Sequence, residues 1–248
     1  SRTHPEPSGC CADHLEQQMF PVSTWGTTYI ATKAFPRGLE QDYWRIMAAE
    51  NGTTVSFAPA VQPSQTLHAG QWMQVVTDQD FVISADKPIG VAQILPSSQE
   101  TITVPQGTPC SSSADCHPGY ECLQIDFTLF VCAPPTCAQE GTDVGCPSGH
   151  TCTCFDAVTC RCSTIGDPAL ILHASAEQYR SNYVFLTPDK YTEDYVNIVA
   201  PMDASVTLDD TAIGGGYFTA IGTSGYKVAR IKVGDDIHRV ESTLPIGV

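Results

Sequence analysis

The chain has 248 residues, which is enough for one large domain or two ordinary ones. Only 16% of them are charged, and 12 Lys and Arg stand against 27 Asp and Glu, which gives a formal charge of −15. This acidic balance argues against nucleic acid and membrane surfaces as partners, because both recruit Lys and Arg. The hydrophobic content of 42% excludes a disordered chain, and every apolar run is too short to span a bilayer.

Alternating apolar and β-branched residues, separated by turn signals, predict strands along most of the chain outside residues 110–162. Only residues 11–18 indicate a short helix. The clearest local pattern is a hairpin over residues 44–57, because Asn51-Gly52 is the dipeptide preferred in a type I′ turn. In chain order, strands are expected at residues 27–33, 44–49, 53–57, 72–76, 81–84, 89–95, 170–174, 183–186, 196–200, 205–208, 226–233 and 237–241.

Cysteine is distributed unevenly: ten of the 12 cysteines lie between Cys110 and Cys162. An even number of cysteines at close spacing, without a redox or haem motif, is most simply a disulfide framework. Such a framework predicts a protein that is secreted or at the cell surface after removal of a signal peptide. The cysteine-rich segment has almost no aliphatic run, so its stability must come from its cross-links.

Within this segment the pattern C-x-x-G-x-x-C occurs twice, at residues 116–122 and 146–152, and indicates a tandem duplication. Many pairings are possible. The favoured one joins Cys110 to Cys122, Cys116 to Cys132, Cys137 to Cys152, Cys146 to Cys160 and Cys154 to Cys162.

Two further questions about the cysteines stay open at this stage. Cys10 and Cys11 lie outside the segment, and they either pair with each other, pair with a neighbouring chain or remain free. A zinc site is the rival hypothesis for residues 152–162, although the spacing there is C-x-C rather than the usual C-x-x-C. Its four ligands would be Cys152, Cys154, Cys160 and Cys162.

The parts of the chain on either side of the cysteine-rich segment resemble each other. In the same order along the chain, residues 28–30 align with 182–184, 41–48 with 193–200, 53–57 with 204–208, and 84–91 with 241–248. We therefore predict an all-β fold with two homologous β-sandwich or jelly-roll-like halves and a small disulfide-rich insert between them. The expected boundaries are 1–14 for an N-terminal segment, 15–105 for the first half, 106–165 for the insert and 166–248 for the second half.

The alignment also predicts that the second half is incomplete at its C-terminal end. The first half continues from residues 88–91 into an apolar strand at 92–95, whereas the second half stops at Val248. An open strand position invites pairing with another chain. Either the polypeptide continues past Val248, or a segment from a neighbouring copy, such as residues 1–11, fills the position and makes a polymer by strand donation.

Five stretches of the sequence together carry a resemblance to a known family. They are Trp44-Arg-Ile-Met-Ala-Ala-Glu-Asn-Gly, Lys87-Pro-Ile-Gly-Val-Ala-Gln, Gly166-Asp-Pro-Ala-Leu-Ile-Leu, Tyr183-Val-Phe-Leu-Thr-Pro and Tyr195-Val-Asn-Ile-Val-Ala-Pro. With these stretches the chain resembles the IgGFc-binding protein N-terminal domain family. The likeness covers nearly all of the chain except the insert, which is similar to that of bacterial, myxobacterial members. The resemblance implies an extracellular binding or adhesion module with no known catalytic residues, and it does not transfer IgG binding to a bacterial relative. As the partner we expect another protein or a second copy of the chain.

The sequence contains no recognisable catalytic motif, so we expect no catalytic residue, metal or cofactor. Gly222-Thr-Ser-Gly lacks the spacing of a hydrolase nucleophile, and the seven histidines occur singly. The acidic pairs at 193–194, 209–210 and 235–236 could bind Ca²⁺ or act as acid and base, but predicted turns explain them equally. Asn51-Gly-Thr is a glycosylation sequon that its turn also explains.

Aromatic residues are the candidates for a binding surface, because exposed rings stack on sugars and anchor protein interfaces. The candidates are Trp25, Trp72, Tyr179 and Tyr191, with Tyr183 as a fifth whose place in the repeat favours the core. Three functions stay open: a module for adhesion or assembly with a protein partner, which is preferred; a carbohydrate-binding module with a coplanar row of aromatic rings; and a hydrolase with convergent acid and base groups in a cleft.

Overall fold

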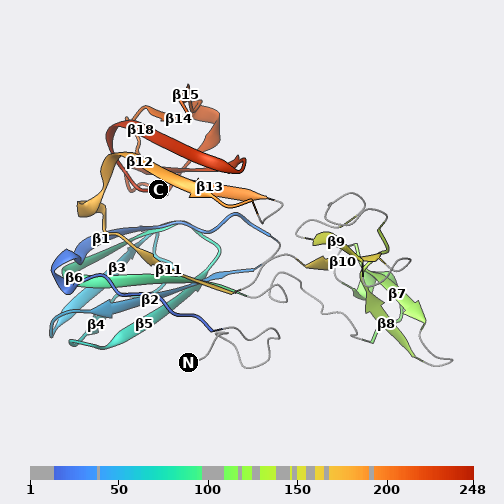
Figure 1. The fold of residues 1–248 in the computed structure, drawn as a ribbon. Helices are drawn as coiled ribbons and strands as arrows, with labels where there is room; N and C mark the ends of the chain where they lie inside the picture. The colour runs from blue at the N-terminus through green and yellow to red at the C-terminus, as the bar shows by residue number, and fades with distance from the viewer. Residues whose placement is uncertain are drawn as a thin grey trace. The chain divides into compact units, whose positions relative to one another are not determined.

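The computed structural model describes residues 14–37, 40–96, 109–116, 119–124, 129–137, 146, 150–154, 160–164, 168–189 and 193–248. The fold is all-β, as predicted, with short 3-10 turns as the helical elements of these residues (Figure 1). Contacts divide the chain into two units. The larger contains residues 16–35, 42–94 and 170–248, and the smaller contains residues 1–15, 36–41 and 95–169.

Seven strands of the larger unit form one sheet that folds around its longest strand, β6. Residues 81–85 of β6 pair with β1 and β3, whereas residues 89–94 pair with β2. Since β4 extends the sheet from β3 and β5 extends it from β2, the strands form two layers that close over one apolar core. The strands are β1 (Gly26–Ala31), β2 (Asp42–Ala48), β3 (Thr53–Ala58), β4 (Gln65–Leu67), β5 (Trp72–Thr77), β6 (Phe81–Leu95) and β11 (Ala169–His173).

The predicted hairpin at Asn51-Gly52 is wrong in its pairing. The turn forms, and Gly52 has the positive φ of 68° that suits glycine. However, β2 and β3 do not pair with each other, because each pairs with a different part of β6. This division lets Trp44 of β2 and Val55 of β3 enter the same core from different layers. The predicted helix at residues 11–18 is also absent over the described residues 14–18.

The second half repeats this arrangement with two sheets, β12-β18-β14-β15 and β13-β17-β16. β18 takes the place of β6: it pairs with β12 and β14, and Gly247 directly after it bridges to Val199 of β13. The strands are β12 (Arg180–Thr187), β13 (Asp194–Pro201), β14 (Val206–Leu208), β15 (Thr211–Ala212), β16 (Phe218–Ala220), β17 (Tyr226–Val233) and β18 (Asp236–Ile246). The repeat predicted from the sequence is therefore a structural repeat.

Equivalent side chains make equivalent contacts in the two halves. The hydroxyl of Tyr29 donates a hydrogen bond of 2.7 Å to the carbonyl of Ile89. In the second half, the hydroxyl of Tyr183 donates a bond of the same length to the carbonyl of Ile246. Tyr183 is therefore a structural residue, as its position in the repeat favoured.

Two glycines also correspond, because each lies beneath an aromatic ring. A Cβ atom on Gly90 would lie 2.8 Å from the ring of Trp25, and one on Gly247 would lie 2.6 Å from the ring of Tyr179. Neither separation is sterically allowed. Glycine at these two positions lets the ring pack directly on the strand.

We predict that Gly90→Ala lowers the free energy of unfolding by about 1–3 kcal/mol, because the added methyl group must displace Trp25. Gly234→Ala is the matched control, since no atom lies within 4 Å of its added Cβ. Urea denaturation measures both variants. Equal midpoints for the two would contradict the packing of Trp25 on Gly90.

β11 follows the insert in the sequence but pairs with β6 in the sheet of the first half. The sequence assigned this stretch to residues 166–248, the second half. In its place in the sheet, the ring of His173 lies 5.0 Å from the ring of Trp44. The first sandwich is thus built from strands on both sides of the insert.

The insert contains two short antiparallel strand pairs cross-linked by disulfides. The pairs are β7 (Glu121–Gln124) with β8 (Phe130–Ala133) and β9 (His150–Cys154) with β10 (Cys160–Thr164), none of which the sequence predicted. Three of the predicted disulfides are confirmed: Cys110–Cys122, Cys116–Cys132 and Cys137–Cys152. Buried Tyr120 packs with Cys110, Cys116, Cys122 and Cys132, so two disulfides lie at the centre of a small core.

The predicted partner of Cys146 is wrong. Cys146 pairs with Cys162, not with Cys160, and this excludes the predicted bond between Cys154 and Cys162. The register of β9 and β10 places Cys162 opposite Cys152, and the sulfur atoms of Cys137, Cys146 and Cys162 all lie within 4.8 Å of one another. Cys152 and Cys162 are therefore both oxidised, which removes two of the four thiolates that the zinc hypothesis needs.

The same register places Cys154 opposite Cys160 in the backbone pairing of β9 and β10. The side chains of these two residues, and the whole of Cys10 and Cys11, lie outside what the structure describes.

We predict that reduction unfolds the insert and leaves both sandwiches intact. The disulfides join residues 12 to 16 positions apart, and a bond closing a loop of this size contributes about 3 kcal/mol. Hydrogen exchange with and without reductant measures the effect: amides of β7 to β10 should lose protection while those of β2 and β3 keep it. Loss of protection in β2 and β3 would show that the sandwiches depend on the insert.

Candidate functional site

The two halves of the larger unit pack against each other through one outer face of each. Ile30 of β1 and Val82 of β6 form a buried cluster with Val199 of β13 and Val228 of β17, and Ile221 completes it. Because Tyr29, Phe81 and other alternate residues face the core of the first sandwich, Ile30 and Val82 lie on its outside. The second half covers this outer face of β1 and β6.

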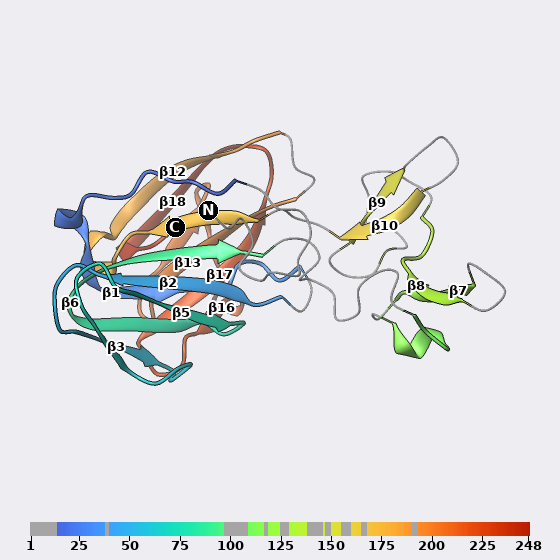
Figure 2. The same cartoon turned by 90° about the horizontal axis from the view of Figure 1, so that it is seen from below.

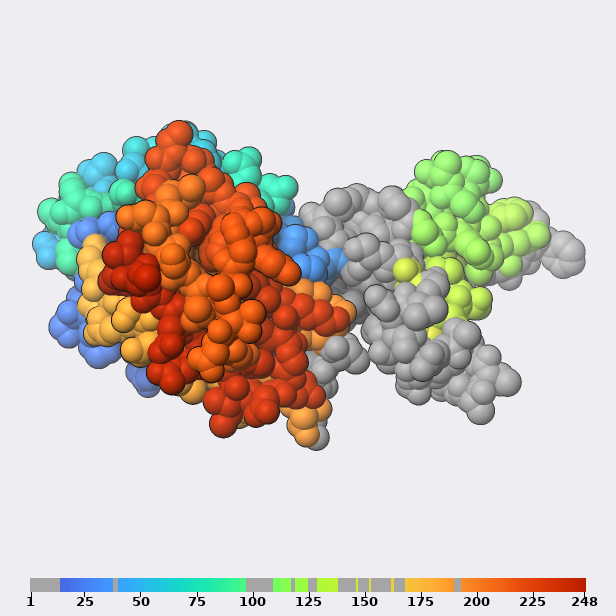
Figure 3. All heavy atoms as spheres, turned by 90° about the horizontal axis from the view of Figure 1, so that it is seen from above, coloured from blue at the N-terminus to red at the C-terminus, as the bar shows by residue number. Residues whose placement is uncertain are grey.

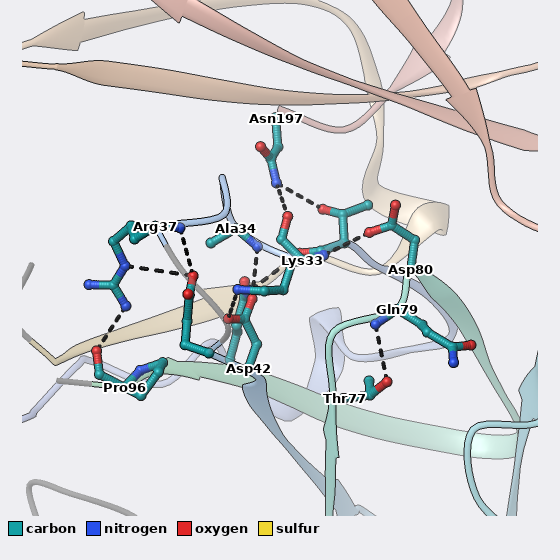
Figure 4. A network of polar contacts seen from close by, with 12 residues as sticks. Lys33, Ala34, Arg37, Asp42, Thr77, Gln79, Asp80, Pro96 and Asn197 are labelled. Atoms are coloured by element: carbon teal, nitrogen blue, oxygen red, sulfur yellow. Dashed lines mark hydrogen bonds and ion pairs between the residues drawn. The ribbon is translucent and has the colours of Figure 1, made fainter. Parts of the chain in front are cut away.

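Polar contacts surround the cluster at one end, and Lys33 is at their centre (Figure 4). The backbone N–H of Lys33 donates a 2.8 Å hydrogen bond to Asp80, while its carbonyl accepts bonds of 2.9 Å from Asn197 and from Arg230. Arg230 also forms an ion pair with Asp80. The second half thereby satisfies polar backbone groups of the first half, which fixes how the two sandwiches meet.

A second part of this network lies inside the first sandwich. The ammonium group of Lys33 is 3.0 Å from Asp42, and both side chains are buried. Gln93 donates to Asp42 and to the carbonyl of Thr32, and its amide oxygen lies 2.9 Å from Nε2 of His173. Burial lowers the pKa of His173 to about 4, so its imidazole is neutral at physiological pH.

We predict that His173 makes the fold less stable in acid. The unfolded chain takes up its proton near pH 6.5 and the folded chain only near pH 4, so stability falls as the pH drops through this window. His173→Asn should remove that loss, which is at most about 3 kcal/mol. The midpoints of urea denaturation at pH 7 and pH 4.5 measure this loss of stability. His68→Asn, which replaces an exposed histidine, is the control. An unchanged difference between the two midpoints in His173→Asn would contradict the assignment.

A cavity of about 240 Å³ lies beside His173 and is lined by aromatic residues. Trp25, Tyr29 and Phe20 contribute to its wall, together with Gly90 and Val91 of β6. Its volume falls below the roughly 300–1,000 Å³ of small-molecule pockets. His173 lines this cavity, and its pKa is lowered by burial. No acid group and base group face each other among the residues that line the cavity. We therefore do not regard it as the main site.

The feature that stands out is an apolar outer face on β12 and β18, which we call the β12–β18 face. Val184, Leu186 and Ile237 point away from the core and are 70%, 68% and 67% exposed. Leu186 and Ile237 are directly opposite each other in the strand pairing. Residues on the solvent face of an antiparallel sheet are normally polar, and clustered apolar side chains there mark an interaction surface.

Equivalent positions in the two halves differ in exposure. In the first half, Ile30 lies opposite Val82 on the outside of the sheet; in the second half, Val184 lies opposite Arg239 in the same place. Ile30 is only 3% exposed because the second half covers it, whereas Val184 is 70% exposed. Figure 3 looks onto the second half, in orange to red, and shows its atoms uncovered by the strands of the first half.

A second outer face is formed by β2 and β5, which run side by side in Figure 2. We call it the β2–β5 face. Trp72 and Val76 are 52% and 40% exposed, and Met47 lies opposite Trp72 in the pairing. The guanidinium carbon of Arg45 is 4.9 Å from the centroid of the Trp72 ring, a cation–π contact.

The structure places the four predicted aromatic residues in different environments. Trp72 is exposed on the β2–β5 face, while Trp25 covers Gly90 and donates its indole N–H to the carbonyl of Phe20. Tyr179 packs against the buried cluster between the halves, where desolvation raises its pKa. Tyr191 lies outside the described residues.

Val184, Leu186 and Ile237 were not among the binding residues predicted from the sequence. A signal for the first two exists: residues 183–186 are all apolar, although an antiparallel strand with one face in water should alternate. A strand that is apolar on both faces is covered on both, or has a face that binds something.

One member of each acidic pair has a hydrogen-bond partner in the described chain: Glu193, Asp209 and Asp236. Asp209 accepts hydrogen bonds from His238 and from the backbone N–H of Arg239, which lowers the pKa of Asp209 and raises that of His238. The bond from Lys232 lowers the pKa of Glu193. Asn51, in the sequon, is exposed and accepts a bond from the N–H of Ala69.

Comparison with protein families matches residues 2–117 and 144–248 to the family described as IgGFc binding protein. The chain belongs to the IgGFc-binding family. No curated protein matches the chain.

Two solved structures are similar to this chain. The stem and receptor-binding domain of the spike protein P1 from bacteriophage PM2 is 8% identical, with 88% of this chain and 74% of that chain covered and a TM-score of 0.17. An anti-sigma factor domain-containing protein is 10% identical, with coverage of 87% and 73% and a TM-score of 0.16. Scores this low carry no argument about the fold.

The four disulfides among the described residues and the membership in the IgGFc-binding family fit a secreted protein. Among the residues that the structure describes, no helix is long and apolar enough to cross a membrane.

Proposed function

We propose that the chain is a non-catalytic extracellular module that binds or adheres to a protein through the β12–β18 face. The observation that carries the proposal is the exposure of Val184, Leu186 and Ile237 on a sheet whose counterpart in the first half is buried. Burying three such side chains would contribute several kcal/mol to a complex, before the costs of association. Membership in the IgGFc-binding family supports a protein as the partner.

The surroundings of the three residues suit a protein interface. Arg239 and Glu241 form an exposed ion pair of 2.7 Å on the neighbouring positions of β18. An apolar centre with a charged rim is the usual anatomy of a protein interface. The rim gives orientation, and the apolar side chains supply most of the free energy of binding.

A carbohydrate is the alternative partner, and the geometry supports it less. Glycan binding needs free ring faces that lie in a row. One face of Trp72 is covered by Arg45, and the ring of Trp25 packs on Gly90. Tyr179 packs between the two halves.

We predict that a photoreactive residue in place of Leu186 cross-links to a protein in the native extracellular material. The same residue in place of Met202, which is 53% exposed, is the control and should not. Leu186→Asp should then weaken binding to the identified protein at least tenfold, because a charge is buried in an apolar contact. Met202→Asp should leave the affinity unchanged. A glycan array that binds the wild type, and loses binding in Trp72→Ala, would instead support the carbohydrate alternative.

A further inference from the structure

We propose that the β12–β18 face of one copy binds the β2–β5 face of a second copy, so that chains associate head to tail. The inference rests on the proposed function, because it names a second copy of the chain as a partner of the β12–β18 face. It differs from strand donation, since whole sheet faces make the contact.

The contact between the two halves within one chain is the template. There the outer face of β1 and β6, with Ile30 and Val82, packs on the outer face of β13 and β17, with Val199 and Val228. The strand pairings identify the equivalent of each face in the other half. Both equivalents carry exposed apolar side chains among the described residues, so each half has one outer face in this contact and one outside it, which we call its free face.

The first free face corresponds to the covering surface. Val199 lies opposite Gly247 and Val228, just as Met47 lies opposite Gly90 and Trp72. Met47 and Trp72 therefore occupy the positions of Val199 and Val228. In the second half these positions cover a neighbouring sandwich, and in the first half Trp72 is 52% exposed.

The second free face corresponds to the covered surface. Val184 and Arg239 occupy the positions of Ile30 and Val82, and Ile237 lies at the position of Asp80. In the proposed contact the ring of Trp72 would meet Val184 and the guanidinium group of Arg239. An aromatic ring packs favourably against both an aliphatic side chain and a guanidinium group.

The contact is heterologous, because it joins two different faces. A heterologous contact leaves one face of each kind free at the ends of a pair, so further copies can add. In the contact between the halves, Ser175 and Glu177 pack against Gly26, which has no side chain. The equivalent of Gly26 in the second half is Arg180, whose long side chain leaves no such room. The proposed contact is therefore limited to the sheet faces.

Charge sets the conditions under which association is strongest. Each copy carries a formal charge of −15, so copies repel one another at low ionic strength. Salt screens this repulsion and leaves apolar contacts intact. Association should therefore increase between low and moderate salt, which is the opposite of a contact held by opposite charges.

Sedimentation velocity on the full chain tests the proposal with two complementary variants. Leu186→Asp with Ile237→Asp blocks the β12–β18 face, and Trp72→Asp with Val76→Asp blocks the β2–β5 face. The wild type should show a sedimentation coefficient that rises with protein concentration. Each variant alone should stay monomeric, and an equimolar mixture of the two should form a 1:1 dimer through the two intact faces. Met202→Asp should behave like the wild type, and near-UV circular dichroism confirms that each variant is folded.

Three results would overturn the proposal. The first is a wild type that stays monomeric in moderate salt up to its solubility limit. The second is self-association of either blocked variant, which would show that one face binds its own kind. The third is a mixture of the blocked variants that remains monomeric while the wild type associates. Cross-linking from position 186 to a different protein, with a monomeric wild type, would leave the proposed function standing and reject only the second copy as partner.

Discussion

The packing of Ile30 and Val82 against Val199 and Val228 is the contact on which the arrangement of the larger unit depends. A β-sandwich has two outer faces, and two sandwiches in one chain have four. This contact buries one face of each, and the other two faces carry exposed apolar side chains among the described residues. The backbone of Lys33, bonded to residues of both halves, fixes the orientation, because its buried polar groups would be left unsatisfied in another one. The free surfaces of the molecule therefore follow from its internal contact.

Much of the fold could be predicted because strand alternation and self-similarity are local properties of a sequence. The repeat placed Tyr29 with Tyr183 and Gly90 with Gly247 before any pairing was known, and the structure gives each pair the same contacts. Pairing partners could not be predicted in this way. The Asn51-Gly52 turn favours a hairpin, but β6 is long enough to pair with β2 and β3 separately. The bond of Cys146 depended on the register of two strands in a segment with almost no apolar pattern.

The candidate surface was less predictable than the fold, for a physical reason. Alternation shows that a strand has two faces, and not which of them a distant part of the chain covers. Ile30 and Val184 are equivalent and both apolar, yet one is buried and the other exposed. Aromatic type was also a weak guide, since Tyr179 at the position of Trp25 became part of the contact between the halves. The burial of equivalent positions in the structure distinguishes the surfaces that pack within the chain from those available for binding.

The place of β11 in the first sheet has a consequence for the order in which the chain folds. β6 is synthesised well before its neighbour β11, and the whole of residues 96–168 comes between them. During synthesis this edge of β6 has no partner from its own sheet, and an unpaired edge can pair with another chain. The first sandwich is completed only when the ribosome has passed the insert. Closure of the first sandwich therefore cannot precede synthesis of the insert, although the two regions have separate cores.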